Sequence, residues 1–185
     1  MTTEAKTART VWKLDPSHSV VEFSAKHMMI TTVRGQFGTV EGEIVVNEEN
    51  PAQSSVAVEI DATGIDTRAE QRDTHLRSAD FLDVENFPKI TFRSTRIEGR
   101  YREPGDRFKV IGDLTIRGTT REVTLDATYE GAGKDPWGGE RVSFSADTKI
   151  DRRDFGLVWN VGLEAGGVLV GHDIKIHLEA QAVKA

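Results

Sequence analysis

Most of the chain alternates between apolar and polar residues, the pattern of antiparallel strands with one buried face and one wet face. The clearest case is residues 20–29, where even positions are mostly polar and odd positions predict one inward face: Val21, Phe23, Ala25, His27 and Met29. Similar patterning predicts further strands over residues 11–14, 37–46, 54–62, 89–98, 107–116, 122–129, 141–150 and 170–182. Residues 107–116 and 122–129 are expected to form a hairpin that turns at residues 117–120. Residues 155–161 are ambiguous. The pattern therefore predicts about eight or nine strands.

One segment, Thr67–Phe81, has helical rather than strand periodicity. Thr67 and Glu70 have the spacing of a capping box, in which two side chains satisfy free amides of the first helical turn. The segment carries a weak apolar stripe, formed by Ala69, Leu76 and Ala79. We therefore expect one short helix in a protein otherwise made of strands.

Two charged residues, Arg72 and Asp73, interrupt this apolar stripe. A helix face that docks on a sheet is normally apolar, so this pair needs partners. One hypothesis is that the pair meets strand-end groups at a barrel rim. The other is that it forms a polar gate over a ligand cavity.

Strands of about ten residues with regular alternation favour a closed antiparallel barrel, because closure leaves no free edge strand. A barrel of about eight strands can enclose a small ligand. A β-sandwich is the alternative. We expect residues 1–10 to form a disordered tail and residues 11–185 to form a single domain.

The predicted inward positions are mostly aromatic or aliphatic, as in any β core, so they fit either a filled interior or a ligand cavity. Four small inward residues leave space that neighbours or a ligand must fill: Ala25, Gly112, Ala127 and Ala146. His27 is the polar exception on its face. It is either a hydrogen-bonded core histidine or a contact for the polar head of a ligand.

Composition excludes several classes of function. The net charge of −6 argues against nucleic acid, and against an anionic membrane surface, as a partner attracted by charge. The chain has no cysteine, so thiol nucleophiles, thiolate metal sites and disulfides are excluded. Residues 1–11 contain no apolar signal-peptide core and no run is long enough to span a membrane, so we expect a cytoplasmic protein.

Catalytic and metal-binding motifs are weak. The five histidines have no compact metal-ligand spacing, and no nucleophile elbow or phosphate-binding glycine loop occurs. Asp73 and His75 are close enough in sequence to act as a general acid and base on a hydrophobic substrate, which is an alternative function. Arg34 is expected in a turn between strands. We expect no metal, no cofactor and no catalytic residue.

Short motifs in a fixed order give the chain a family resemblance. The motifs run along the chain as Leu14–Ser19, Phe23 with His27, Gly35–Phe37, Arg72–Phe81, Phe87–Phe92, Gly112–Gly118, Arg153–Gly156 and Val168–Ile176. Each motif is loose, but their order and spacing resemble the YceI-like family of lipocalin-like polyisoprenoid-binding proteins. The resemblance covers roughly residues 11–182.

The resemblance implies a barrel with a helix near its mouth and an elongated apolar channel for a long isoprenoid chain, whose polar or pyrophosphate head lies near the opening. It also implies that homodimers are possible; many relatives are periplasmic. Position by position, it favours His27, Arg72, Asp73 and His75 at the polar end. Combined with the inward positions, the predicted ligand-binding residues are Phe23, His27, Met29, Arg72, Asp73, His75, Leu76, Phe81, Phe92, Phe108, Phe144, Ile174 and Ile176. A stress-related interaction module with a filled barrel is a further alternative.

Overall fold

The computed structural model describes residues 8–185 and contains ten strands, one α-helix and three short 3₁₀ helices. The strands are β1 (Arg9–Leu14), β2 (Val20–His27), β3 (Thr31–Gln36), β4 (Val40–Asn47), β5 (Ser55–Asp61), β6 (Lys89–Gly99), β7 (Arg107–Ile116), β8 (Thr119–Lys134), β9 (Glu140–Asp151) and β10 (Asp173–Lys184). The helices are α1 (Glu70–Arg77), η1 (Pro16–His18), η2 (Pro51–Gln53) and η3 (Arg152–Phe155).

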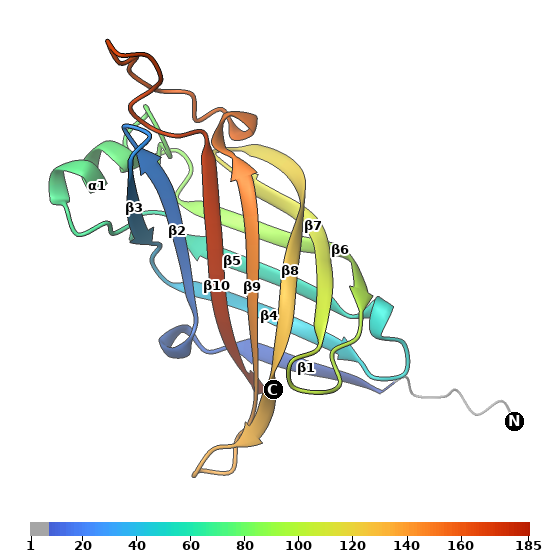
Figure 1. Cartoon of the computed structure of the whole chain (residues 1–185). Coiled ribbons are helices and arrows are strands. Elements are labelled where there is room, and N and C mark those ends of the chain that lie inside the picture. The colour runs from blue at the N-terminus through green and yellow to red at the C-terminus, as the bar shows by residue number, and fades with distance from the viewer. Residues whose placement is uncertain (1–7) are drawn as a thin grey trace, which may run out of the picture.

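Eight strands close an antiparallel barrel in the order β1-β4-β5-β6-β7-β8-β9-β10, and β10 pairs back onto β1 (Figure 1). The β1–β10 seam is short, with three residue pairs that include Leu14 and Ala182. Beyond the seam, the same edge of β10 pairs with β2, which carries β3 as an outer strand. The predicted closed barrel is therefore confirmed, with an extra hairpin at one end.

The β2–β3 hairpin differs from the sequence prediction. We expected one strand to Met29, but β2 ends at His27 because Met28 and Met29 adopt left-handed backbone conformations, with φ of 51° and 63°. A left-handed pair of residues reverses the chain, so residues 31–36 return as β3. Arg34, which we expected in a turn, lies within β3 and is exposed.

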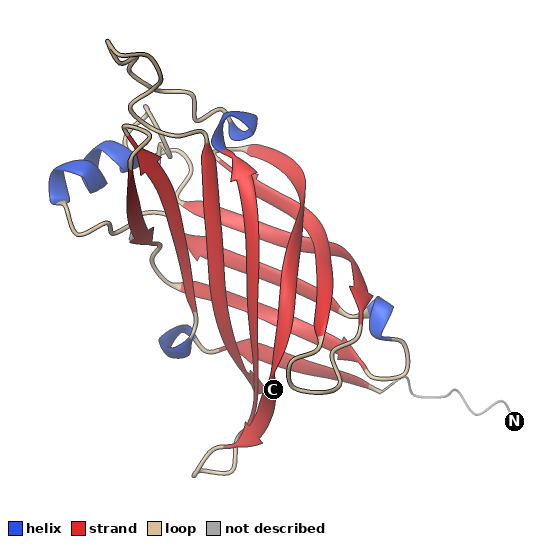
Figure 2. Cartoon of the chain, viewed as in Figure 1, coloured by secondary structure: helices blue, strands red, loops and turns tan. Residues whose placement is uncertain are grey.

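Helix α1 is shorter than predicted and has no capping box (Figure 2). Arg68 takes a left-handed conformation, so the helix starts after it, with Ala69 as the N-cap residue and no side-chain cap. Thr67 lies before this break and donates from both its amide and its hydroxyl to the carboxylate of Asp73. The capping-box prediction was wrong because the backbone turns before the helix begins.

The predicted hairpin of residues 107–129 is confirmed as β7–β8, but its turn is shorter than the predicted residues 117–120. Its turn consists of Arg117 and Gly118, with φ of 48° and 72°, so both central residues are left-handed. Two-residue turns of this kind match the twist of paired strands, and glycine adopts the second position without strain. A tight turn here keeps β7 and β8 in register over ten residue pairs.

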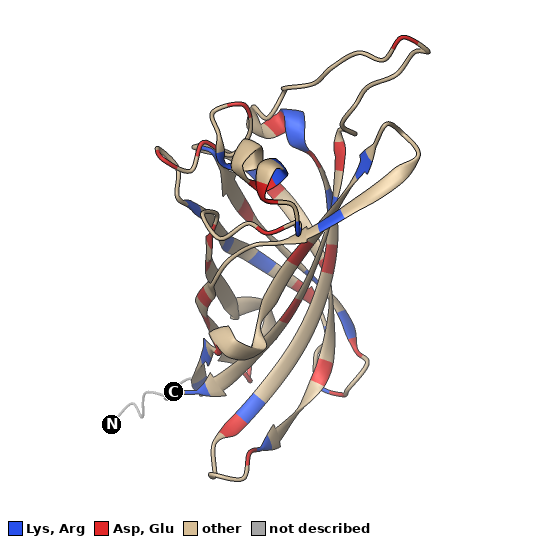
Figure 3. Ribbon diagram, turned by 90° about the vertical axis from the view of Figure 1, so that its left-hand side faces the viewer, with Lys and Arg blue, Asp and Glu red and all other residues tan. Residues whose placement is uncertain are grey.

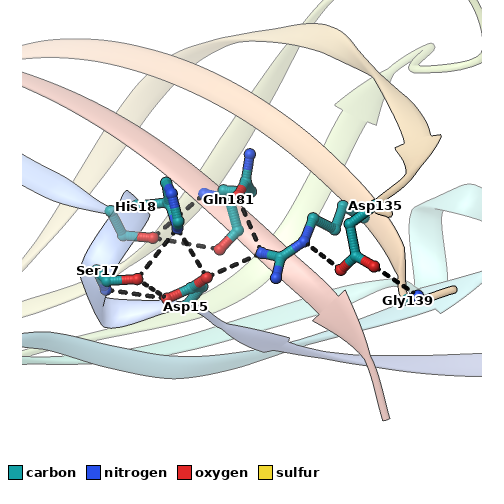
Figure 4. A network of polar contacts seen from close by, with 8 residues as sticks. Asp15, Ser17, His18, Asp135, Gly139 and Gln181 are labelled. Atoms are coloured by element: carbon teal, nitrogen blue, oxygen red, sulfur yellow. Dashed lines mark hydrogen bonds and ion pairs between the residues drawn. The ribbon is translucent and has the colours of Figure 1, made fainter. Parts of the chain in front are cut away.

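The end of the barrel at which the C-terminus lies is braced by an ionic network (Figure 4). Arg141 of β9 donates to the carboxylates of Asp15 and Asp135, each at 2.8 Å. Asp15 also accepts hydrogen bonds from Ser17 and His18. Together with the contact to Arg141, these hydrogen bonds hold the pKa of Asp15 well below 3.8. The network ties the segment after β1 to the β8–β9 hairpin, next to the short seam.

The predicted N-terminal tail is only partly within the described chain. Residues 1–7 lie outside it, so the prediction is untested there. Arg9 and Thr10, which we assigned to the tail, belong to β1 and pair with β4. Pairing with β4 satisfies their backbone groups, so the domain begins earlier than predicted.

Candidate ligand cavity

The barrel encloses a cavity of about 240 Å³ that extends along its length. Its wall is made almost entirely of apolar side chains from the inward faces of the strands, together with residues from α1 and the loops around it. Near the seam the wall includes Leu14, and at the opposite end it includes Val170 and Leu157. The cavity is elongated and apolar, which suits a hydrocarbon chain.

Eight of the predicted ligand-binding residues line this cavity. Leu76 and Phe81 belong to the segment predicted as a helix, and the other six are at predicted inward strand positions: Phe23, Phe92, Phe108, Phe144, Ile174 and Ile176. Phe108 and Phe144 pack edge to face, with ring centroids 5.9 Å apart. Such packing is typical of paired aromatic side chains in apolar interiors. Their contact with a ligand stays a prediction.

The other five predicted residues do not line the cavity: His27, Met29, Arg72, Asp73 and His75. His27 is exposed at the end of β2, and Met29 is 60% exposed in the turn that follows. Alternation along the strand predicted that both side chains point inward, but this alternation does not continue past the end of the strand. His27 therefore lies beyond the inner face on which we expected it.

Arg72 and Asp73 are joined through Thr67 rather than to each other. Arg72 donates from Nε to the Thr67 hydroxyl at 2.7 Å and from Nη2 to the Thr67 carbonyl at 2.8 Å. Asp73 is buried and accepts from the Thr67 amide at 2.9 Å. The two charges hold the loop before α1 in place, which is close to the rim hypothesis and gives no support to a polar gate.

His75 lies behind the cavity wall. Its Nε2 is 2.8 Å from Oδ2 of Asp80, and its ring packs edge to face against Phe81 and Trp159. Phe81 is the residue of this group that faces the cavity. His75 and Asp73 therefore do not converge on the interior as an acid–base pair would have to.

Arg152 of η3 lines the cavity and was not among the predicted ligand-binding residues. It is 3% exposed and lines the cavity, and its guanidinium donates to the carbonyls of Leu157, Trp159, Val170 and Gly171 at 2.6–3.2 Å. The guanidinium also lies 5.8 Å from the centroid of the Phe81 ring. Its one sequence signal was its place directly before the Arg153–Gly156 motif.

Within the described residues, no carboxylate forms an ion pair with Arg152. The adjacent Asp151 is committed to Arg153, at 2.6 Å, and this contact lowers the pKa of Asp151 to about 2. Burial lowers the pKa of Arg152, because a charged group loses hydration there. The cavity wall thus contains a buried cation that is stabilised by neutral carbonyls and an aromatic ring.

The opposite end of the cavity carries a neutral polar pair. Ser54 and Tyr101 lie in the wall, with their hydroxyl oxygens 2.6 Å apart, and Tyr101 also donates to the Pro51 carbonyl. Burial raises the pKa of the Tyr101 hydroxyl, so this end remains uncharged at neutral pH. The two ends of the cavity therefore differ in charge.

The middle of the cavity is widened by small side chains on adjacent strands. Ala127 of β8 and Ala146 of β9 are paired in register, and Leu178 of β10 pairs with Ala146. All three line the cavity. Gly112 is also buried, but a side chain there would meet the carbonyl of Arg93 at 2.4 Å, so that glycine serves strand packing.

Two further findings concern membranes and metals. Among residues 8–185, no helix has the length and apolar character needed to cross a bilayer. In the same part of the chain, no three histidine or carboxylate side chains are grouped as a metal site would require.

Comparison with known proteins gives consistent matches. Residues 12–182 match the family described as the YceI-like domain. The protein YceI of Escherichia coli O157:H7 is 40% identical over 153 residues, which is 82% of this chain and 78% of that protein. The crystal structure of BcnA from Burkholderia cenocepacia has a TM-score of 0.74 at 23% identity, covering 91% of this chain and 98% of BcnA.

A solved domain from Saccharophagus degradans shares the fold at 11% identity, with a TM-score of 0.70, and covers 94% of this chain and 98% of that domain. It is described as a polyisoprenoid-binding domain implicated in plant cell wall breakdown. At this identity the likeness concerns the fold alone.

Proposed function

The chain belongs to the YceI-like family, and from that premise we propose that it binds a long-chain isoprenoid-like lipid inside the barrel. The observation that carries the proposal is the apolar cavity along the barrel axis. The polyisoprenoid-binding description of the Saccharophagus degradans domain supports the choice of lipid. The aromatic and aliphatic wall excludes water without demanding a particular chemical group.

The cavity volume sets a scale for the bound chain. An apolar cavity of about 150 Å³ accommodates benzene, with six carbons, so 240 Å³ accommodates on the order of ten carbons. At about 0.8 kcal/mol per buried CH₂, ten carbons supply roughly 8 kcal/mol before the cost of association is subtracted. A longer isoprenoid then requires side chains in the wall to move, or part of the chain to leave the barrel.

We place the polar head of the lipid at the α1 end, beside Arg152. An anionic head such as a pyrophosphate gains most from a cation that lacks a carboxylate partner, because hydrogen bonds between charged groups are the strong ones. The Ser54–Tyr101 pair at the other end is neutral and already satisfied. The end of the cavity that contains Arg152 is therefore the better match for a charged head.

The alternatives fit the geometry less well. An enzyme that uses Asp73 and His75 needs both side chains in the cavity, and neither lines it. An interaction module with a filled barrel does not account for a 240 Å³ void. Storage or carriage of the lipid belongs to the same proposal. Assembly as a homodimer belongs to it through the family resemblance, and sedimentation velocity measures the oligomeric state.

The direct test is mass spectrometry of an organic extract of the natively purified protein. The proposal predicts a stoichiometric long-chain species, isoprenoid in character. A clean extract, from cells that contain such lipids, contradicts it.

A matched pair of variants tests the location. Ala146→Phe adds a ring in the middle of the cavity, where small side chains leave room for a ligand, and is expected to reduce the lipid content strongly. Thr124→Phe adds the same ring at an exposed position on the outside of β8 and is expected to leave the lipid content unchanged. Equal lipid content in both folded variants would place the ligand outside the barrel.

A further inference from the structure

Large apolar side chains are exposed mainly at one end of the molecule. Six such side chains are exposed in the described chain: Met28, Met29, Ile30, Trp137, Val158 and Val161. All but Trp137 belong to the β2–β3 turn or to the loop between η3 and β10. Exposed apolar groups that cluster in this way mark a surface for another apolar phase or molecule.

These two segments form one structure, which we call the apolar tip (residues 28–30 and 156–171). The Met28 amide donates to the Leu169 carbonyl at 2.7 Å, and the Gly171 amide donates to the Lys26 carbonyl at 2.8 Å. A β-bridge joins His27 to Val170. The backbone contacts hold both segments against each other, so their apolar side chains are presented together.

The apolar tip contains one charged side chain outside the buried core, Glu164. In Figure 3 the two loops that project at the upper right are mostly tan, with one acidic position at the outer end of the longer loop. Figure 1 shows the same loops extending beyond the strand ends. The tip therefore projects from the barrel and carries a single charged side chain, Glu164.

The cavity reaches the base of the apolar tip. Ala25 and Val170 line the cavity, and Val170 is bridged to His27, immediately before the turn. A hydrocarbon chain that leaves this end of the cavity emerges next to the exposed apolar side chains. The tip therefore adjoins one end of the ligand cavity.

A basic collar lies just below the tip, formed by Lys26, Arg34 and Lys175. Ser24 pairs with both Arg34 and Lys175 in register, and Lys26 lies two residues further along β2, so all three side chains are on the outer face. All are exposed, and none forms an ion pair with a carboxylate of the described residues. The nearby Asp173 is paired with Lys149.

We propose that the apolar tip is the surface by which this protein rests on a lipid bilayer, with residues 28–30, Val158 and Val161 among the acyl chains and the basic collar at the lipid phosphates. Apolar groups backed by lysine and arginine match the layered chemistry of a membrane interface. A projecting tip enters a fluid phase readily, whereas a protein partner would need a matching hollow. The inference rests on the proposed function, because a protein that binds a lipid exchanges this ligand with membranes.

The absence of cysteine makes the test specific, since one engineered thiol is the only labelling site. Ile30→Cys and Trp137→Cys, each carrying a polarity-sensitive fluorophore, are mixed with phosphatidylcholine vesicles with and without a minor share of phosphatidylglycerol. Ile30 is 75% exposed at the tip, and Trp137 is 87% exposed at the opposite end, which makes it the matched control. We expect a blue shift only for the label at position 30.

A second pair of variants, without labels, measures how much the apolar tip contributes to vesicle binding. Ile30→Asp is expected to weaken vesicle flotation by about tenfold or more, because a carboxylate does not enter the acyl region. Trp137→Asp is expected to leave flotation unchanged. No shift at position 30, equal shifts at both positions, or association of the protein with itself at the tip in place of vesicle binding would overturn the proposal.

The extracted lipid separates this inference from the proposed function. If Ile30→Asp retains its copurified lipid but does not float with vesicles, both the tip and the cavity have the proposed roles. Normal vesicle binding by a protein with a clean extract would support the tip and contradict the lipid ligand.

Discussion

Replacement of Arg152 by methionine is the perturbation whose cost the structure defines most closely. Methionine retains the apolar stem and removes the guanidinium, which donates to four carbonyls of the loop between η3 and β10. The Val170 carbonyl also accepts from Asn160 at 2.7 Å, so it keeps a partner. The carbonyls of Leu157, Trp159 and Gly171 lose the donor that Arg152 provides.

Two opposing contributions decide how much Arg152→Met lowers the free energy of unfolding. Each buried carbonyl left without a donor costs about 1–3 kcal/mol, and partial access to water at the barrel rim lowers that range. Removal of the buried charge recovers part of the hydration that the folded protein gives up, since buried ions cost several kcal/mol each. We therefore expect Arg152→Met to lower the free energy of unfolding by about 3 kcal/mol, a large part of the 5–15 kcal/mol typical of a domain.

Urea denaturation measures this loss, and hydrogen exchange locates it. The midpoint should fall with an unchanged m-value, and amides of residues 157–171 should exchange faster while the β7–β8 ladder stays protected. Arg153→Met is the matched control, because Arg153 is half-exposed in an ion pair and should contribute at most about 1 kcal/mol. A loss below about 1 kcal/mol for Arg152→Met, with unchanged exchange in the loop, would refute the reasoning.

Three further predictions follow from the described contacts. Arg141→Met should destabilise the protein at neutral pH and much less in acid. The pKa of Asp15 is depressed in the folded state, so the stability that its contacts contribute is present above pH 3.8 and is lost as the pH falls below that value. Unfolding of both proteins, measured across the acid range, will show this difference. The contact of His177 with Asp147 raises the pKa of His177 above 6.5, so the stability that this contact contributes is complete below pH 6.5 and is lost as the pH rises above the raised pKa. His177→Gln should remove this change from the dependence of the free energy of unfolding on pH. Gly118→Val should cost roughly 1–2 kcal/mol in thermal unfolding, because a β-branched residue is strained at φ 72° and its Cβ would meet the Phe87 ring; an unchanged melting temperature would contradict the turn assignment.

For the candidate cavity, the strand pattern predicted inward side chains correctly only within regular strands. Positions inside regular strands, such as Phe92, Phe144 and Ile176, were predicted correctly, because the alternation of side chains is fixed by the strand backbone. His27 and Met29 were misplaced, because the strand ends at His27 and its alternation fails there. Arg72, Asp73 and His75 were predicted from the family resemblance, and the structure uses them to hold α1 and its loop.

The sequence by itself determined the class of fold, the antiparallel strands, the inward faces and the β7–β8 turn, because these depend on local backbone preference and on the period of apolar residues. Tertiary structure alone decided the closing seam, the β2–β3 hairpin, the volume of the cavity and the role of Arg152. Each of these depends on contacts between residues far apart in the chain, such as Leu14 with Ala182 and Arg152 with Val170. A local pattern fixes which face of a strand is apolar, but only the assembled barrel fixes what that face encloses.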